Sequence, residues 1–201
     1  GSDNVAIGRS ALAVNTTASN NVAVGHNAMV SNTTGHRNTA IGNEALEANT
    51  TATNNTAVGD RALTANTTGT ANTAVGNSAL TATTTGNYNT GVGTFALDAN
   101  TTGQYNSALG YATLGASTTG DYNTAVGLTA LENATTADKN TGIGYAALNA
   151  NTTGANNSAV GASALAANTT ANSQNAFGFE ALMTITTAGG ATAFGHKAGR
   201  L

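Results

Sequence analysis

The side chains that could carry acid–base or metal chemistry are few and far apart in this chain. His26 and His196 lie near opposite ends of the sequence, and His36 lies in an expected turn. Glu44 and Glu47 flank a short apolar stretch. General acid–base catalysis needs a cleft and shifted pKa values, and a metal needs closely spaced ligands. We therefore expect no catalytic residue, no metal site and no cofactor.

Nucleophile and phosphate-binding motifs do not occur either. Ser107 and Ser158 replace threonine in a repeated position, and no Gly-x-Ser-x-Gly pattern surrounds them. Asn15-Thr16-Thr17 and its copies match the N-glycosylation sequon, but ladder and turn roles explain them better in a pattern this regular. The acidic residues of the central region are expected to provide solubility: Asp98, Asp121, Glu132 and Asp138. The sequence predicts a protein that is not an enzyme.

Composition excludes several further classes. The 201 residues contain 6 Lys and Arg against 9 Asp and Glu, and no cysteine. Six scattered basic residues do not form the patch that a nucleic-acid partner needs, and disulfides and cysteine-ligated metals are impossible. No apolar run approaches the roughly 18 residues of a membrane span, so we expect no membrane partner for this segment.

A repeat dominates the sequence. The motif Ala-Val-Gly, with variants, recurs twelve times at a constant 17-residue spacing. The glycines are Gly8, Gly25, Gly42, Gly59, Gly76, Gly93, Gly110, Gly127, Gly144, Gly161, Gly178 and Gly195. Flexible linkers tolerate insertions at little cost, so a spacing without any insertion indicates equal coils stacked in register.

We number the 17-residue unit from its asparagine, as in Asn55-Thr56-Ala57-Val58-Gly59, and call the residues at unit position n column n. Coil 1 begins at Asn4. Helical repeats usually need about 33 residues or more, so this unit is too short for them. The sequence predicts an all-β fold, a parallel β-solenoid of twelve coils, with two short strands per coil at positions 1–4 and 7–11.

The turn residues fit this fold. The column 5 glycines indicate a bend with positive φ, or a backbone packed too closely for a Cβ atom. The Asn-Thr-Thr-Gly run, as at Asn66 to Gly69, supplies another turn. The chain has no proline, which is typical of strands that must donate hydrogen bonds to neighbouring coils.

Two columns are expected to form the core. Column 4 is always large and apolar, and column 9 is leucine or methionine in eleven coils. Adjacent strand residues point to opposite faces, so the alanine and glycine residues of columns 3 and 8 should face outward. Outward columns of tiny residues favour close approach of a second chain, although alanine could simply fill a tight corner.

Two further columns are expected to form ladders. The column 1 asparagines, from Asn4 to Asn157, should build an amide ladder along the axis. Tyr88, Tyr105 and Tyr122 occupy column 17 in three consecutive coils and should form a stacked, exposed stripe. Such a stripe either stabilises the turn or provides a surface contact for a carbohydrate or receptor.

The expected domain organisation is simple. Residues 1–3, which begin Gly1-Ser2, are interpreted as leader or cloning-derived residues. Residues 4–201 are expected to form a single solenoid repeat domain.

Asn-Val-Ala-Ile-Gly at Asn4 to Gly8, followed in later units by Ala-Leu and Asn-Thr-Thr-Gly, resembles the head repeats of trimeric autotransporter adhesins (YadA-like heads). It resembles even more closely the 17-residue repeats of phage tail-fibre-like and bacterial surface proteins. The match covers about residues 4–198, although the repeat of adhesin heads is typically shorter. The resemblance implies a left-handed β-roll, a homotrimer, and an extracellular location on a cell surface or virion fibre.

Two functions follow as expectations. The first is a structural or adhesive, non-catalytic segment of an extracellular fibre, with itself as partner and a host-surface glycan or receptor as a further one. The second is an ice-binding solenoid that uses threonine ladders. Ice binding is disfavoured because columns 13 and 14 are sequence neighbours and should face opposite sides, while Val5, Val22 and Asn175 interrupt column 2.

Overall fold

One three-residue strand per repeat forms a single twelve-stranded parallel sheet. The structure, a computed structural model, describes residues 1–187 and 189–199. Within these residues the chain contains strands and turns but no helix, so the expected all-β parallel solenoid is confirmed. Residues 188 and 200–201 of the expected repeat domain lie outside the described residues.

The strands occupy unit positions 2–4. They are β1 (Val5–Ile7), β2 (Val22–Val24), β3 (Thr39–Ile41), β4 (Thr56–Val58), β5 (Thr73–Val75), β6 (Thr90–Val92), β7 (Ser107–Leu109), β8 (Thr124–Val126), β9 (Thr141–Ile143), β10 (Ser158–Val160), β11 (Asn175–Phe177) and β12 (Thr192–Phe194).

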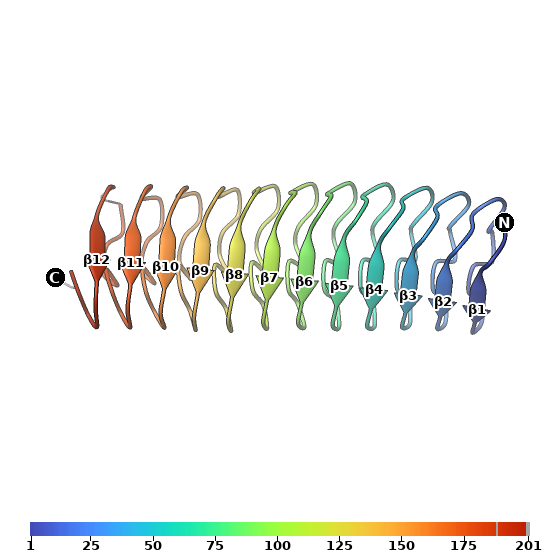
Figure 1. Cartoon of the computed structure of the whole chain (residues 1–201), viewed down its shortest axis with the longest axis horizontal. Coiled ribbons are helices and arrows are strands. Elements are labelled where there is room, and N and C mark those ends of the chain that lie inside the picture. The colour runs from blue at the N-terminus through green and yellow to red at the C-terminus, as the bar shows by residue number, and fades with distance from the viewer. Residues whose placement is uncertain (188, 200–201) are drawn as a thin grey trace.

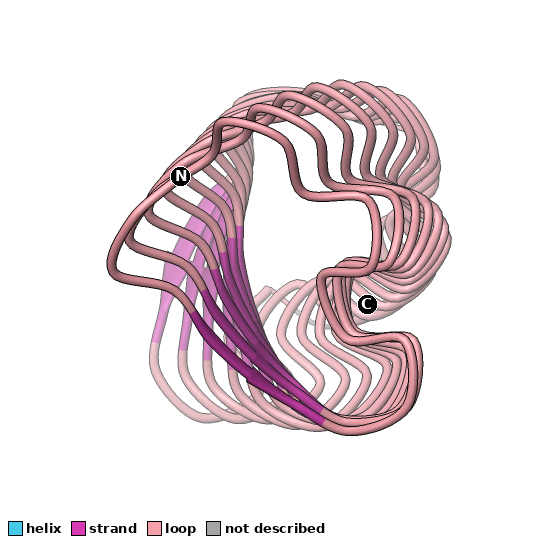
Figure 2. Ribbon diagram, turned by 90° about the vertical axis from the view of Figure 1, so that its right-hand side faces the viewer, coloured by secondary structure: helices cyan, strands magenta, loops and turns pink. Residues whose placement is uncertain are grey.

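Each strand pairs only with the strands of the coils before and after it, in the order of the sequence. The register joins equivalent positions of successive coils, as in Thr56 with Thr73 and Val58 with Val75. Figure 1 shows the strands side by side along the long axis of the molecule. A spacing of about 4.8 Å gives a rod about 53 Å long. Figure 2, which looks along the rod, shows the sheet on one side of the coil and turns on the others.

The core lies on the side of the strand opposite to the one predicted from the sequence. Column 3 is buried in coils 2 to 12, whereas no residue of column 4 is buried. Ala57, for example, is fully buried, while Ile41 is 40% exposed. The prediction that column 4 belongs to the core is therefore wrong, and so is the prediction that columns 3 and 8 face outward.

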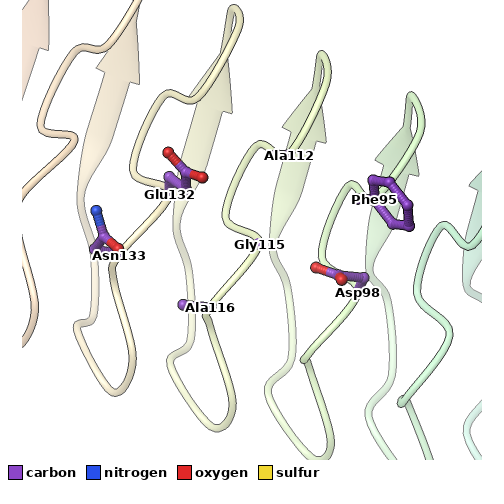
Figure 3. Close-up of a pocket in the computed structure, with 7 residues that line it drawn as sticks. All are labelled: Phe95, Asp98, Ala112, Gly115, Ala116, Glu132 and Asn133. Atoms are coloured by element: carbon purple, nitrogen blue, oxygen red, sulfur yellow. The ribbon is translucent and has the colours of Figure 1, made fainter.

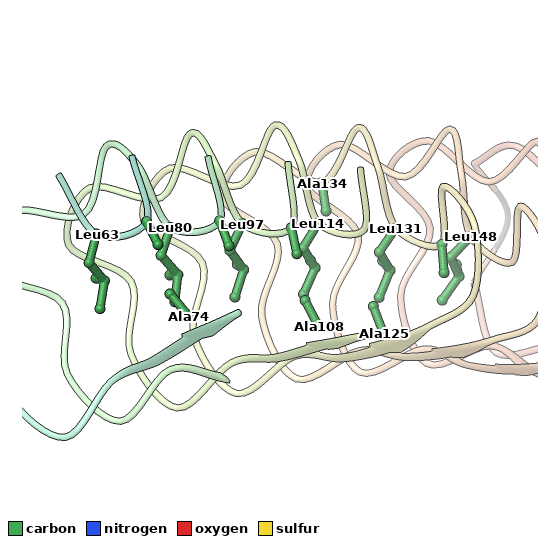
Figure 4. Close-up of a cluster of buried hydrophobic side chains, with 14 of the residues drawn as sticks. Leu63, Ala74, Leu80, Leu97, Ala108, Leu114, Ala125, Leu131, Ala134 and Leu148 are labelled. Carbon is green, nitrogen blue, oxygen red and sulfur yellow. The ribbon is translucent and has the colours of Figure 1, made fainter. Parts of the chain in front are cut away.

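The narrow interior explains this orientation. The column 9 leucines extend across the coil toward the column 3 alanines, as Leu80 and Ala74 show in Figure 4. A Cβ atom on Gly91, which belongs to column 3, would lie only 3.3 Å from Cγ and Cδ1 of Leu80. Opposite leucine there is thus room for alanine or glycine only, and the larger column 4 side chains must point outward. The prediction that column 9 is core is confirmed.

Positions 7–11 form turns, and the predicted second strand does not exist in the described residues. The residues of columns 7 and 9 have positive φ, such as 54° at both Ser78 and Leu80. Alternation of side chains holds for extended backbone only. Because left-handed residues interrupt it, neighbouring Ala79 and Leu80 are both buried.

The column 5 glycines combine two constraints. Their φ values lie between 122° and 141°, where residues with a Cβ atom are strained. In coils 1 to 11 an added Cβ atom would also meet the backbone of the next coil, for example at 2.6 Å from the carbonyl oxygen of Gly144 for Gly127. From the sequence, positive φ and close backbone packing are alternative reasons for these glycines, and in coils 1 to 11 both reasons apply.

Buried asparagines connect the coils. In column 1, the Asn106 Nδ2 group donates to the carbonyl of Gly120 in its own coil at 2.7 Å. The backbone N–H of Asn123 donates to Oδ1 of Asn106 at 2.9 Å, which joins one coil to the next. The Nδ2 group of Asn106 also lies 3.2 Å from Oδ1 of Asn89. The predicted amide ladder is present and carries backbone bonds as well.

Column 12 forms a second internal ladder, in which Asn49 Nδ2 donates to Oδ1 of Asn32 at 2.8 Å. The ladder has gaps where column 12 holds another residue, as at Thr83 in coil 5 and Ser117 in coil 7. In the coils before these, the Oδ1 atoms of Asn66 and Asn100 have no hydrogen-bond partner. The hydroxyl of Ser117 also lacks one.

Candidate functional site

The most extended feature of the surface is the outer side of the sheet. We define the sheet face as columns 2 and 4 of the twelve coils, from Val5 and Ile7 to Thr192 and Phe194. None of these residues is buried. Column 2 holds threonine, serine, valine and one asparagine, and column 4 holds valine, isoleucine, leucine and phenylalanine. The sheet face therefore contains no charged residue along the whole rod.

The column 4 side chains form a continuous apolar stripe on this face. Ile7 is 60% exposed, Leu109 is 52% and Phe194 is 69%. At the C-terminal end the rings of Phe177 and Phe194 stack with centroids 4.8 Å apart. Large contiguous apolar patches on soluble proteins commonly mark interaction sites.

The two threonine columns differ in their environment. In column 13 the hydroxyl donates to the carbonyl of the same column in the next coil, as from Thr67 to Thr84 at 3.2 Å. Every column 14 threonine from Thr17 to Thr187 is exposed. Column 14 thus provides one exposed rank of hydroxyl and methyl groups, while the hydroxyls of column 13 serve the contacts between coils.

The tyrosine stripe is present, with Tyr88, Tyr105 and Tyr122 each about half exposed. Adjacent ring centroids are 5.1 and 4.9 Å apart, and the planes are inclined by 6°. Because the rings cover one another, the middle ring presents only its edge and hydroxyl to a partner. All three residues have positive φ and lie in the bends that precede the strands.

The histidines singled out in the sequence have separate partners. Nε2 of His26 accepts from the Arg9 guanidinium at 2.9 Å, and its Nδ1 bonds Oδ1 of Asn43 at 3.1 Å. Nδ1 of His36 accepts the backbone N–H of Ser19 at 2.9 Å. The ring of His196 stacks on that of Phe179, with centroids 5.3 Å apart.

The acidic pair Glu44 and Glu47 is not brought together into a site. Glu44 lies 3.7 Å from the guanidinium of Arg61, which is mostly exposed. Across residues 1–187 and 189–199, no three histidine or carboxylate side chains form a group that could hold a metal ion. Nor does any helix long and apolar enough to cross a membrane occur in that part of the chain.

Apart from Asn15, which is half-buried, the asparagines of the column 12 sequons are buried. Asn32, Asn66 and Asn151 are fully buried, and their Nδ2 groups donate to carbonyl oxygens inside the coil, at 3.1, 3.0 and 2.9 Å respectively. Attachment of a glycan would require these bonds to break.

A shallow groove of about 400 Å³ crosses coils 6, 7 and 8. Its lining comprises Phe95, Asp98, Ala112, Gly115, Ala116, Glu132 and Asn133 (Figure 3). Sequence reasoning did not identify it. The signal was available, because Gly115 is the one glycine in column 10 up to residue 187, and Asp98 and Glu132 are its neighbours in that column.

Burial affects one carboxyl group of this groove. Desolvation raises the pKa of Asp98 above its ordinary value, and hydrogen bonds from the backbone of Asp98 and Ala99 partly oppose this shift. A carboxylate whose charged form is disfavoured by burial gains stability when a positive charge is placed beside it.

Comparisons with known proteins add no family or relative: no protein-family model, no curated protein and no solved structure matches this chain.

Proposed function

We propose that this chain is a structural, non-catalytic segment of an extracellular fibre, and that rods of this kind associate side by side through the sheet face. The resemblance to adhesin heads and tail-fibre-like repeats supports a left-handed homotrimer located on a cell surface or virion fibre. The proposal assigns the chain to mechanical spacing, with adhesion to a host-surface glycan or receptor as an additional role.

The observation that carries the proposal is the uncharged apolar stripe of column 4. Its twelve side chains include Ile7, Leu109 and Phe194, which are more than half exposed. Removing apolar surface from water stabilises by about 25 cal/mol per Å². Contact with another copy is the simplest way for an uncharged face to gain this stabilisation along the full length of the rod.

The dimensions of the sheet face fit a specific interface. The sheet face is about 53 Å long, and its three residues per strand, at about 3.3 Å each, make it about 10 Å wide. The product, about 530 Å² per chain, gives about 1,060 Å² for two facing chains, which passes the roughly 1,000 Å² expected of a specific interface. Self-association through the sheet face therefore replaces the contact through columns 3 and 8, which the burial of those columns excludes.

A second candidate is ice binding. The sheet face offers equally spaced threonine and valine ranks that point the same way, a geometry that the sequence pattern did not predict. Against it, column 4 varies in size from valine to phenylalanine, and Val5, Val22 and Asn175 interrupt the hydroxyls of column 2. A surface this uneven suits contact with a second polypeptide better than contact with the regular surface of ice.

The test places charges on the sheet face. Val75→Glu with Val92→Glu, in column 4 of neighbouring coils, should dissociate the assembly and leave the β-sheet circular dichroism spectrum intact. The control is Thr85→Glu with Thr102→Glu, which adds the same two charges to column 14, outside the sheet face. It should leave the assembly intact.

Sedimentation velocity distinguishes these outcomes. Equal masses for the two double variants would contradict assembly through the sheet face. A monomeric wild type that shows thermal hysteresis and shapes ice would instead support the second candidate.

A further inference from the structure

The middle of the rod differs from its ends in charge. Residues 62–138 contain no lysine and no arginine, but they contain four acidic residues, so this segment carries a charge of −4 against −3 for the whole chain. The groove across coils 6 to 8 lies in this segment. A surface of one sign raises the local concentration of ligands of the opposite sign.

The groove exists because Gly115 interrupts a column of side chains. Asp98 and Glu132 occupy the same column in the coils on either side, and Figure 3 shows them flanking Gly115. A Cβ atom on Gly115 would lie 3.3 Å from Oδ1 of Asp98, so this carboxylate extends over the space that the glycine leaves. Gly115 does not have positive φ, and the backbone therefore does not itself require glycine at this position.

The polar side-chain groups that face the groove accept hydrogen bonds. Two of the three are carboxylates, Asp98 and Glu132, and Oε2 of Glu132 already accepts from Nδ2 of Asn149 at 3.0 Å. The third, Asn133, has committed its Nδ2 group to the carbonyl of Asn149 at 2.9 Å. An exposed aromatic ring, that of Phe95, completes the lining. Carboxylates and an aromatic ring are the groups that stabilise an organic cation. A ligand whose polar groups are all hydrogen-bond donors matches a groove whose polar side-chain groups are acceptors.

We propose that the groove formed by Phe95, Asp98, Gly115 and Glu132 binds an organic cation, with an ammonium or guanidinium group in the space beside Gly115. The bound group donates to the carboxylate of Asp98 and lies against the ring of Phe95, while the carboxylate of Glu132, two coils from Asp98, adds its negative charge to the groove. This site is separate from the sheet face and does not depend on the proposed fibre function. A lysine or arginine side chain of a partner and a free polyamine both carry the required chemistry.

The test titrates the chain with 1,4-diaminobutane at low ionic strength and follows the backbone amide signals by NMR. Shifts should concentrate at residues 95–98, 112–116 and 132–133. The neutral analogue 1,4-butanediol should cause none. A short lysine-containing peptide then tests the other source of the ammonium group, and competition with the diamine shows whether the two share the groove.

Three variants and a matched control test the assignment. Asp98→Asn and Glu132→Gln should each weaken binding about threefold to fivefold, the range expected for one partly exposed ion pair. Gly115→Thr fills the groove without changing the charge, restores the residue found in this column at Thr64 and Thr81, and should abolish the shifts. Glu47→Gln removes a column 10 carboxylate in coil 3 and should have no effect.

Equal affinity in wild type and the Gly115→Thr variant, measured on chains with unchanged β-sheet spectra, would overturn the proposal. Shifts of similar size at all acidic residues, Glu47 included, would do the same, because they would show only nonspecific attraction of a cation to a negative rod.

Discussion

At the scale of single residues, the column 5 glycines determine how closely the coils can stack. The φ of Gly127 is 124°, and its missing side chain leaves room for the carbonyl of Gly144. The last of these glycines, Gly195, has a similar φ of 122°, but an added Cβ atom would meet nothing closer than 3.9 Å. A side chain added at Gly195 therefore causes backbone strain alone, whereas one added at Gly127 also collides with the backbone of the next coil.

The corresponding prediction compares Gly127→Ala with Gly195→Ala. Gly195→Ala should cost about 1–3 kcal/mol in the free energy of unfolding, from backbone strain alone. Gly127→Ala adds a contact of 2.6 Å with a carbonyl oxygen and should cost clearly more, to the point of preventing folding. Chemical denaturation followed by circular dichroism measures both. An unchanged midpoint for Gly127→Ala would show that the coils can move apart at no cost.

At the scale of the structural elements, the period and the sheet could be predicted from the sequence, but the direction of the side chains could not. A strict 17-residue spacing requires coils in register, and this yields the parallel strands and the column 1 ladder. The orientation of columns 3 and 4 depends on the width of the interior, which is known only once Leu80 and Gly91 are in place. The turn at Leu80, with a φ of 54°, has no sequence signal because leucine rarely adopts this conformation.

The groove was missed for a related reason. Gly115 lies outside column 5, in a chain with 25 glycines. The 17-residue spacing places Asp98 and Glu132 beside it in column 10, but only the stacked coils show that the missing side chain leaves a groove. Departures from a repeat become informative when the column they interrupt is known.

The second prediction concerns the gap in the column 12 ladder at Ser117. Ser117→Asn restores the column 12 asparagine of coil 7, and its amide group can donate to Oδ1 of Asn100, which has no partner now. It also removes the unpaired hydroxyl of Ser117. An unsatisfied buried polar group costs about 1–3 kcal/mol, so the variant should be about 1 kcal/mol more stable. The denaturation midpoint measures this change, and Ser163→Asn, in column 7, is the surface control. A lower stability for Ser117→Asn would show that the ladder has no room to close.

At the scale of the whole molecule, the rod has two different kinds of surface. Its sheet face is uncharged over the full length and carries the apolar stripe of column 4, while its middle third combines acidic residues with the groove. The first suits permanent contact with identical chains, and the second suits a smaller, charged ligand. An assembly that covers the sheet face leaves the other sides of each rod free, because the turns form those sides (Figure 2).

The mass of the chain in solution tests the central claim most directly. Sedimentation equilibrium on the wild-type chain should give three times the chain mass of 19.6 kDa, independent of concentration in the micromolar range. The Val75→Glu and Val92→Glu double variant should fall to the mass of one copy. A well-folded wild type of 19.6 kDa at all concentrations would contradict the account.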